Sequence, residues 1–210
     1  MENELLKIFD QHKNPIGVAT RKDVHRLGYW HEAFHCWFVR NESGMDYIYM
    51  QIRSEHKKDY PNLIDITAAG HLLANESVED GVREIKEELG VEVDYNELIS
   101  LGTIHYSVTR DDFIDNEIAH VFLYRSEHEL TDYLLQEEEV SGVVKAKLTD
   151  FSELWSGEKS EVFVEGFEID REGTQSFFSK KVNKSAFVPH EKSYYECIIK
   201  GIASNIRDQK

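Results

Sequence analysis

The stretch that is most informative about the fold is residues 69–91, AGHLLANESVEDGVREIKEELGV. Their second half has the apolar spacing of an amphipathic helix, with one narrow stripe formed by Val78, Val82, Ile85 and Leu89. Ser77 is a suitable N-cap residue with Asp80 three positions later, and Gly90 stands where a left-handed C-terminal cap belongs. The pattern therefore predicts a short helix with both ends marked.

The same helix gathers three carboxylates, Glu84, Glu87 and Glu88, on a second sector. Like charges at this spacing repel each other, so the arrangement costs stability unless a cation or basic side chains neutralise it. Carboxylate oxygens are the ligands that Mg²⁺ and Mn²⁺ prefer. The alternative is a solvated acidic face, which is the commoner meaning of a Glu-rich helix. From the carboxylates alone, that alternative is favoured.

The composition is that of a globular protein. Of the 210 residues, 40% are hydrophobic and 11% are aromatic, and no apolar run approaches the roughly 18 residues that a membrane helix needs. The first residues lack the basic and apolar regions of a signal peptide, and two distant cysteines, Cys36 and Cys197, make no disulfide framework. We therefore expect a cytoplasmic protein that does not bind membranes.

The charge constrains the ligand. A net charge of −16 and a pI of about 5.0 argue against nucleic acid as a partner, because the phosphates would be repelled. A small anionic substrate would have to be received by bound cations. This agrees with the carboxylate cluster, although many cytoplasmic proteins are acidic for solubility alone.

Strands surround the acidic helix along the chain. They are predicted at residues 4–9, 16–20, 35–39, 47–52, 102–109, 118–125 and 140–148, with a turn at 41–44 and a loop at 110–117. A short helical segment is predicted at 21–28, and a closing helix begins near Thr149 with Thr149 or Asp150 as its cap. Strands before and after one acidic helix predict an α+β fold, with a mixed sheet between helices.

The pattern changes near residue 156. Residues 162–169 and 174–182 predict a hairpin, and Pro189 opens an amphipathic helix through about Ile202. We expect residues 1–155 to form one domain and residues 156–210 an extension packed on it, because one hairpin and one helix cannot bury a core of their own. The extension could be an appendage, a dimer surface or a lid, so a homodimer stays open.

The central stretch resembles the signature of the Nudix hydrolases, Gly-x5-Glu-x7-Arg-Glu-U-x-Glu-Glu-x-Gly-U, in which U is aliphatic. The match is carried by Gly70, Glu76 and residues 83–91, REIKEELGV. Six residues, not the family's seven, separate Glu76 from Arg83, and we place the missing residue between Ser77 and Gly81. The resemblance implies an α/β/α sandwich for residues 1–155.

The resemblance also implies roles for the signature residues. In the family the first Glu and the Arg brace the loop, so Glu76 and Arg83 would pair, and the shortened spacing leaves this pairing open. The later carboxylates hold the metal, which assigns Mg²⁺ or Mn²⁺ to Glu84, Glu87 and Glu88, together with the Gly70 carbonyl. Arg83 and the three glutamates would then form the catalytic centre.

Other stretches resemble one branch of this superfamily, the group related to isopentenyl-diphosphate isomerase. They are Trp30–Phe34, Gln51–Ser54, Lys57, Tyr60–Pro61, Asp65–His71 and Asp115–Glu117. The likeness covers about residues 4–155. In that branch the residues matching Arg53 and Lys57 meet the substrate diphosphate, which suits a guanidinium fork and an ammonium point charge. The alternative is that both side chains lie in solvent at the end of a strand and bind no ligand.

The same branch builds a second metal site, whose ligands match His25, His31, His71, Asp115 and Glu117. Imidazole with carboxylate ligation suits Mn²⁺, Zn²⁺ or Fe²⁺. Lone histidines are more often structural, and that alternative stays open. In Nudix enzymes an acid from a loop beyond the signature often serves as general base for water, which indicates Glu117, with Glu138 and Glu139 as further candidates.

The function that the resemblance implies is metal-dependent cleavage of a diphosphate bond in a nucleoside-diphosphate-linked or related small molecule. Two other classes stay open, an isopentenyl-diphosphate isomerase and a noncatalytic ligand sensor. The isomerase pattern has a cysteine immediately before its Gly-His pair, and Ala69 stands there in this chain. Because a methyl group cannot transfer a proton, hydrolysis is favoured over isomerisation.

Overall fold

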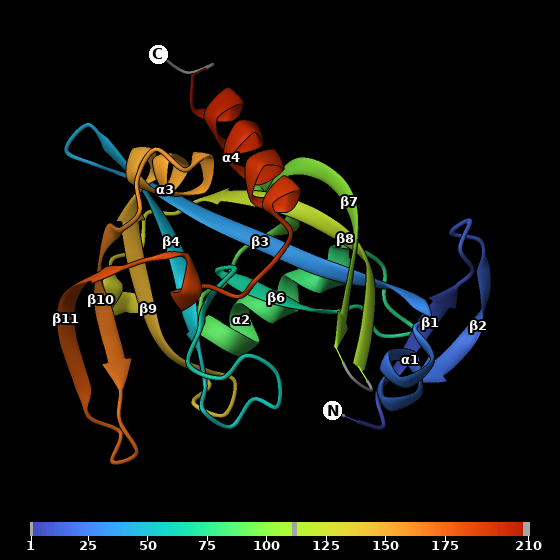
Figure 1. The fold of residues 1–210 in the computed structure, drawn as a ribbon. Coiled ribbons are helices and arrows are strands. Elements are labelled where there is room, and N and C mark those ends of the chain that lie inside the picture. Colours follow the sequence, from blue (N-terminus) through green and yellow to red (C-terminus); the bar gives the residue numbers. More distant parts are fainter. Residues whose placement is uncertain (1, 111–112, 208–210) are drawn as a thin grey trace.

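The computed structural model describes residues 2–110 and 113–207 (Figure 1). The strands are β1 (Leu5–Phe9), β2 (Pro15–Thr20), β3 (Trp30–Glu42), β4 (Met45–Arg53), β5 (Ile64–Asp65), β6 (Ala68–His71), β7 (Ile99–Arg110), β8 (Phe113–Arg125), β9 (Val140–Lys147), β10 (Val162–Ile169) and β11 (Gln175–Val182). The helices are α1 (Arg21–Leu27), α2 (Arg83–Leu89), α3 (Leu148–Ser156) and α4 (Lys192–Arg207), with short 3₁₀ turns at Glu79–Val82, Tyr95–Glu97, Leu130–Asp132 and Lys184–Ala186.

The strands form one mixed sheet. Its main path runs β11-β10-β9-β4-β3-β1-β2, while β5 pairs with β4, β6 with β3, and β8 with both β3 and β7. The β3–β8 pair is parallel, with Trp30 opposite Asn116, and the other strand pairs are antiparallel. The predicted α+β class with a mixed sheet is therefore confirmed.

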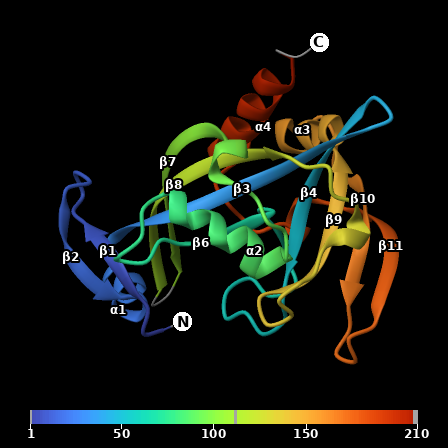
Figure 2. The same ribbon diagram turned by 180° about the vertical axis from the view of Figure 1, so that it is seen from behind.

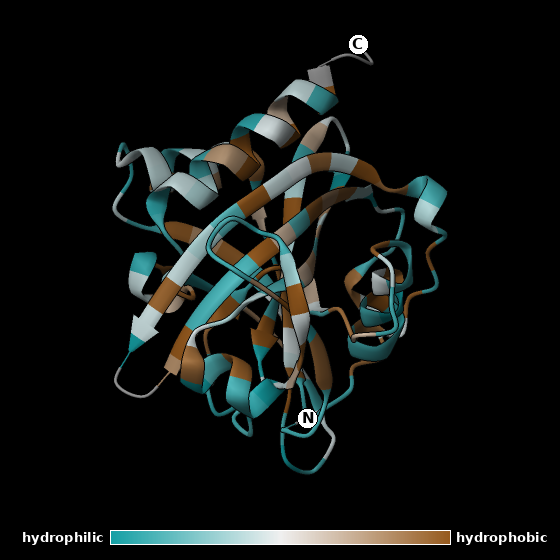
Figure 3. Cartoon of the chain, turned by 90° about the vertical axis from the view of Figure 1, so that its right-hand side faces the viewer, coloured by the Kyte–Doolittle hydropathy of each residue, from teal (hydrophilic) through white to brown (hydrophobic). Residues whose placement is uncertain are grey.

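Helices cover both faces of the sheet, and β3 shows how the sequence directs this. Successive side chains of a strand point to opposite faces. Phe34, Cys36 and Phe38 lie in the core that contains Ile85 and Leu89 of α2. Trp37 and Val39 lie in the second core, which contains buried residues of α3 and α4. Figures 1 and 2 show α2 on one side of β3 and α3 with α4 on the other, and Figure 3 shows the alternating hydropathy along the strands.

The C-terminal hairpin and helix join this architecture directly. β10 pairs with β9, with Gly166 opposite Val144, so the sheet is continuous across residue 155. α4 lies beside α3, and the ring of Tyr195 stacks on Trp155 at 3.6 Å between ring centroids. Within the described residues, no helix combines the length and the apolar character that a membrane crossing requires.

The predicted loop at 110–117 is wrong at every described residue, because β7 extends to Arg110 and β8 covers residues 113–117. β8 begins at Phe113, which pairs with Arg110 of β7, so Asp115 and Glu117 belong to a strand. Residues 111 and 112 lie outside the described residues. The polar run was misread as a loop because its side chains have partners inside the fold: Asn116 Nδ2, for example, donates to the Gly28 carbonyl at 2.7 Å.

Three predicted helix starts are also wrong. Ser77 caps no helix, since its amide and hydroxyl both bind Asp80 Oδ2 at 2.8 Å, and the α-helix begins only at Arg83, after a tighter 3₁₀ turn. That turn lies where we placed the missing residue of the signature. α3 begins at Leu148 without a side-chain cap, so neither Thr149 nor Asp150 caps it. Pro189 precedes α4 by several residues. Gly90 does form the predicted left-handed cap, with φ of 70°.

Candidate active site

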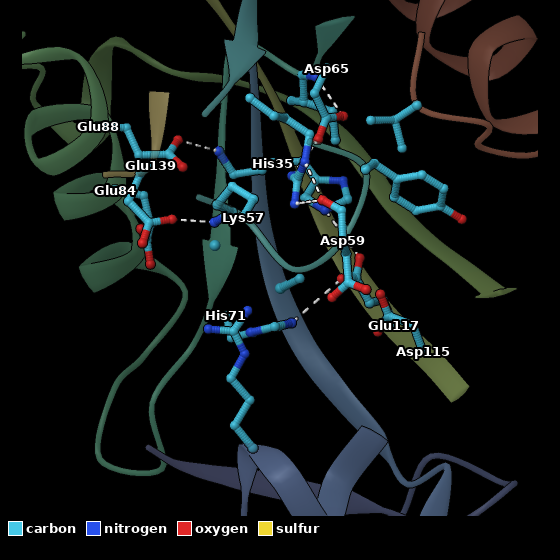
Figure 4. Close-up of a pocket in the computed structure, with 18 of the residues that line it drawn as sticks. His35, Lys57, Asp59, Asp65, His71, Glu84, Glu88, Asp115, Glu117 and Glu139 are labelled. Carbon is cyan, nitrogen blue, oxygen red and sulfur yellow. Dashed lines mark hydrogen bonds and ion pairs between the residues drawn. The ribbon is translucent and has the colours of Figure 1, made fainter. Parts of the chain in front are cut away.

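A pocket of about 490 Å³ opens between α2 on one side and β8 on the other. Figure 4 shows Glu84 and Glu88 on one wall of this pocket, facing Asp115 and Glu117 on the opposite wall. Among the described residues, its lining includes ten carboxylates and four Arg or Lys side chains. The pocket is therefore strongly negative, and an anion enters it favourably only together with cations.

Glu88 forms the deepest part of the α2 wall, with 5% of its surface exposed. Its Oε2 accepts hydrogen bonds from the Ala69 amide at 3.0 Å and from Gln51 Nε2 at 3.2 Å. Burial raises the pKa of Glu88 to about 8, and the nearby charge of Glu84 adds to this shift. A carboxylate held there as an anion at neutral pH needs a positive partner.

Glu84 lies one helical turn earlier and is also largely buried. Burial raises its pKa to about 7, and the charge of Glu87 acts in the same direction against the opposing effect of Arg83. The helix can approach β6 this closely because residue 70 is glycine: a Cβ there would lie 2.1 Å from Cδ and Oε1 of Glu84. Gly70 thus leaves its backbone beside the Glu84 carboxylate.

Arg83 connects the signature loop to the carboxylates. Its Nε and Nη2 donate to the two oxygens of Glu76 at 2.5 and 3.0 Å, so the pairing that the shortened spacing left open is formed. Nη2 also donates to the His71 carbonyl at 3.1 Å. Nη1 donates to Glu84 at 2.7 Å and to Glu87 at 3.0 Å. One guanidinium therefore fixes the loop and two of the three predicted metal ligands.

Arg53 and Lys57 both line the pocket, but each has a protein partner. Arg53 Nη1 donates to Asp65 Oδ2 at 2.8 Å, and its Nε and Nη2 donate to the Asp59 carbonyl at 3.0 and 2.9 Å. Lys57 forms an ion pair with Glu139. The two cations predicted to meet a diphosphate are thus held in the pocket lining by contacts within the protein.

His25, His31, His71 and Asp115 converge on the β8 side, with one ligand atom from each within 4.8 Å of the others. Nε2 of His25 and Nε2 of His31 lie 3.5 and 3.4 Å from Asp115 Oδ1. His71 Nε2 lies 3.7 Å from Glu117 Oε1. The structure therefore brings together all five residues that the sequence assigned to a second metal site.

Hydrogen bonding shows that this cluster fits a cation. Nδ1 of His25 contacts the Arg21 carbonyl at 2.9 Å and Nδ1 of His31 contacts the Tyr29 carbonyl at 3.2 Å, so each Nδ1 carries the proton. Burial lowers the pKa of His31, and burial lowers that of His71 to about 3, so these rings are neutral at physiological pH. Three buried acceptor atoms then lack a hydrogen-bond partner among the described residues: His25 Nε2, His31 Nε2 and Asp115 Oδ1. These nitrogen and oxygen atoms face one another with lone pairs and no hydrogen between them. That is the arrangement of ligand atoms that binds a metal ion.

Glu117, our candidate base, lies on β8 rather than in a loop. Its Oε2 is 3.1 Å from His35 Nε2. Burial works against its ionisation, yet His35 and His71 hold the pKa of Glu117 well below its usual range. Of the other candidates, Glu139 lines the pocket in its pair with Lys57, whereas Glu138 is exposed and lies outside it.

Asp65, His35 and His190 are among the pocket residues that the sequence analysis did not assign to a site. Asp65 was only part of a longer resemblance, His35 was read as a strand residue, and His190 lay in the extension. Asp65 binds both Arg53 and His190, at 2.8 and 2.9 Å. Asp65 had a signal in the stretch that resembles the isomerase branch, whereas the positions of His35 and His190 depend on strand pairing and on packing of the distant C-terminal segment.

Comparison with known proteins identifies the family of this chain. The model of the NUDIX domain matches residues 29–165 of this chain. The chain belongs to the Nudix family. An uncharacterized Nudix hydrolase of Clostridium acetobutylicum is 41% identical over 202 residues, which cover 96% of this chain and 98% of that protein. Isopentenyl-diphosphate Delta-isomerase 2 of Photorhabdus laumondii is 29% identical over 128 residues, 60% of this chain and 70% of that protein.

Solved structures share the Nudix fold. A crystal structure of a Deinococcus radiodurans protein superposes with a TM-score of 0.55 and 20% identity, covering 73% of this chain and 90% of that chain. The MutT protein of Methanosarcina mazei Go1 gives a TM-score of 0.52 and 16% identity, covering 84% of this chain and 95% of that chain. The predicted Nudix sandwich, and the likeness to both Nudix hydrolases and the isomerase branch, are therefore confirmed.

Proposed function

We propose that this Nudix protein is a divalent-metal-dependent hydrolase that cleaves the diphosphate bond of a small molecule, such as a nucleoside diphosphate linked to another group. One observation carries the proposal: Glu84 and Glu88 are buried side by side at the pocket wall, and their pKa values are raised to about 7 and about 8. Such a pair is costly in the empty protein and becomes favourable when a hard cation neutralises it.

Glu84, Glu87 and Glu88, with the Gly70 carbonyl, would hold Mg²⁺ or Mn²⁺. Bound there, the metal supplies charge neutralisation for the diphosphate and lowers the pKa of a coordinated water. Arg83 keeps Glu84 and Glu87 oriented from the signature loop. Arg53 and Lys57 line the pocket, where their charges attract the diphosphate oxygens. Glu117, ionised and facing the same pocket, would accept a proton from the attacking water.

A second metal site is proposed at His25, His31, His71, Asp115 and Glu117. It rests on the unpartnered buried acceptors described above, which a cation would satisfy. The mixed imidazole and carboxylate set suits Mn²⁺, Zn²⁺ or Fe²⁺ better than Mg²⁺. A cation there would lie on the wall opposite α2, so the pocket would present positive charge to the substrate from two sides.

Isopentenyl-diphosphate isomerisation is the second candidate, because His25, His31, His71 and Asp115 converge as that branch requires, with Glu117 beside His71. Against it, Ala69 stands where the isomerase carries its cysteine, and the described residues contain two cysteines, Cys36 and Cys197, neither of which lines the pocket. A noncatalytic sensor is disfavoured because a pure binding pocket has no use for the costly burial of Glu84 and Glu88.

A substrate screen tests the proposal. Purified protein is incubated with dinucleoside polyphosphates, nucleotide sugars, coenzymes and isoprenoid diphosphates in Mg²⁺ or Mn²⁺, and phosphate-containing products are identified by mass spectrometry. We expect cleavage of at least one class that disappears with EDTA and in Glu87→Gln and Glu88→Gln. Cleavage that survives in both variants at saturating metal would contradict the assignment of the metal to α2.

A further inference from the structure

The segment between the last 3₁₀ turn and α4 returns to the pocket. It lies beyond residues 29–165, the part that the family model matches, yet Val188, Pro189 and His190 all line the pocket. The Val188 amide donates to the Ile64 carbonyl at 2.9 Å, which attaches the segment to β5. The next residue of β5 is Asp65, so the attachment places His190 directly beside that carboxylate.

His190, Asp65 and Arg53 form a continuous chain of hydrogen bonds. His190 Nε2 lies 2.9 Å from Asp65 Oδ1, and Arg53 Nη1 donates to Asp65 Oδ2 at 2.8 Å. The side chains of His190 and Asp65 are 8% and 6% exposed, so water cannot readily replace either bond. The two oxygens of Asp65 are thus divided between His190 on one side and Arg53 on the other, with the Ile66 amide also donating to Oδ1 at 2.8 Å.

We infer that His190 is a positioning residue for diphosphate binding: by fixing the Asp65 carboxylate, it holds the Arg53 guanidinium at the angle from which it receives the substrate. The inference rests on the proposed function and extends the site to the C-terminal segment. It gives residues 156–210 a role in substrate binding that differs from the roles of a lid or a dimer surface.

The geometry explains why a residue in contact with Asp65 matters for Arg53. Arg53 has three oriented donors in use, Nη1 on Asp65 and Nε with Nη2 on the Asp59 carbonyl. If His190 is lost, Asp65 Oδ1 keeps only the Ile66 amide, and the carboxylate can turn about its χ2 bond. The guanidinium of Arg53 would then keep its two bonds to the Asp59 carbonyl but lose a fixed partner at Nη1, and orientation of this planar group is what makes bidentate contact with phosphate oxygens strong.

Binding of inorganic pyrophosphate with Mg²⁺, followed by isothermal titration calorimetry, tests the inference without requiring turnover. We expect His190→Ala to weaken pyrophosphate binding by about tenfold, the size associated with one hydrogen bond to a charged group. His190→Gln should stay within about threefold of wild type, because the Gln Nε2 can reach the same Asp65 oxygen. In an Arg53→Ala background, His190→Ala should cause no further loss, since its effect passes through Arg53.

Tyr195→Phe is the matched control for docking of the extension. The Tyr195 hydroxyl donates to the Val188 carbonyl at 2.7 Å, so this variant removes one buried hydrogen bond from the same segment but leaves the Asp65 chain intact. It should lower the melting temperature to a similar degree as His190→Ala while keeping the pyrophosphate affinity of wild type.

The outcomes separate this inference from the proposed function. Wild-type affinity in His190→Ala, together with weakened binding in Arg53→Ala, would overturn the positioning role and leave diphosphate recognition standing. Equal losses in Tyr195→Phe and His190→Ala would also overturn it, because they would show general docking of the segment. If wild-type protein binds no pyrophosphate with Mg²⁺, the proposed function fails and the inference falls with it.

Discussion

Two clusters of acceptor atoms face each other across the pocket, and they are built on opposite principles. On α2, Glu84 and Glu88 are buried carboxylates whose pKa values are raised, chiefly by burial, and only Arg83 stands close as a counter-charge to Glu84. On β8, Asp115 and Glu117 meet histidine side chains, and His35 and His71 hold the pKa of Glu117 well below its usual range despite burial. The first cluster therefore contains carboxylates whose negative charge is unfavourable without a cation. The second contains buried acceptor atoms that lack hydrogen-bond partners among the residues that the structure describes.

This difference indicates how each cluster would respond to a cation. The α2 cluster offers oxygen donors, which suits the hard ions Mg²⁺ and Mn²⁺. The β8 cluster offers three nitrogens with a carboxylate, oriented by the backbone carbonyls that hold Nδ1 of His25 and His31. We therefore expect the two walls to differ in metal preference, in pH response and in their importance for turnover.

The largest effect is expected from Glu88→Gln. The amide keeps the shape of the side chain but removes a charged metal ligand, and loss of several kcal/mol of transition-state stabilisation lowers kcat by about 1,000-fold. Steady-state kinetics at saturating metal on the screened substrate measure this. Glu92→Gln is the control, because Glu92 carries the same charge on the surface in a pair with Lys86. A kcat within threefold of wild type in Glu88→Gln would remove the α2 wall from catalysis.

Metal-induced thermal shifts should separate the two walls. A ligand at about 100 times its Kd stabilises the folded state by about 2.7 kcal/mol, which corresponds to about 5–10 °C for a chain of this size. We expect Glu88→Gln to abolish the shift given by Mg²⁺ and His31→Gln to abolish the shift given by Zn²⁺. Each variant should keep the shift of the other metal. Loss of both shifts in both variants would show that one shared site binds both ions.

A smaller effect is expected in the pH dependence of the metal-free protein. The pKa values of Glu84 and Glu88 are raised from 4.5 to about 7 and about 8, so their contribution to stability is complete below pH 4.5 and is lost as pH rises through 7 to 8. Histidines with depressed pKa values act in the opposite direction but are already neutral above pH 7. The melting temperature measured in EDTA should therefore fall as pH rises through 7 toward 8 and level off above that, and Glu88→Gln should flatten the slope. If the melting temperature of Glu88→Gln depends on pH as steeply as that of wild type, the raised pKa of Glu88 is not the cause.

The fold and the α2 wall were accessible from the sequence because their signals are local. The carboxylates, Arg83, Gly70 and Gly90 stand within one stretch, and its resemblance to the Nudix signature implied their roles. The strand containing Asp115 and Glu117 was partly missed because its polar residues point into a pocket, which reverses the usual link between polarity and loops. His190 was missed because it reaches Asp65 across 125 positions of the chain, and only tertiary packing brings these two residues together.

The separation of hydrolase from isomerase tests the account most directly. The screened diphosphates and isopentenyl diphosphate are incubated with wild-type protein and Mg²⁺ in D₂¹⁸O, and the products are analysed by mass spectrometry after exchange into ordinary water. Hydrolysis at phosphorus leaves one ¹⁸O in a phosphate-containing product, whereas isomerisation leaves carbon-bound deuterium in dimethylallyl diphosphate. Because Ala69 cannot transfer a proton, the account predicts ¹⁸O incorporation with at least one compound and no deuterated dimethylallyl product above the protein-free control. Deuterated dimethylallyl diphosphate formed at enzymatic rates, with no ¹⁸O-labelled product from any compound, would contradict it.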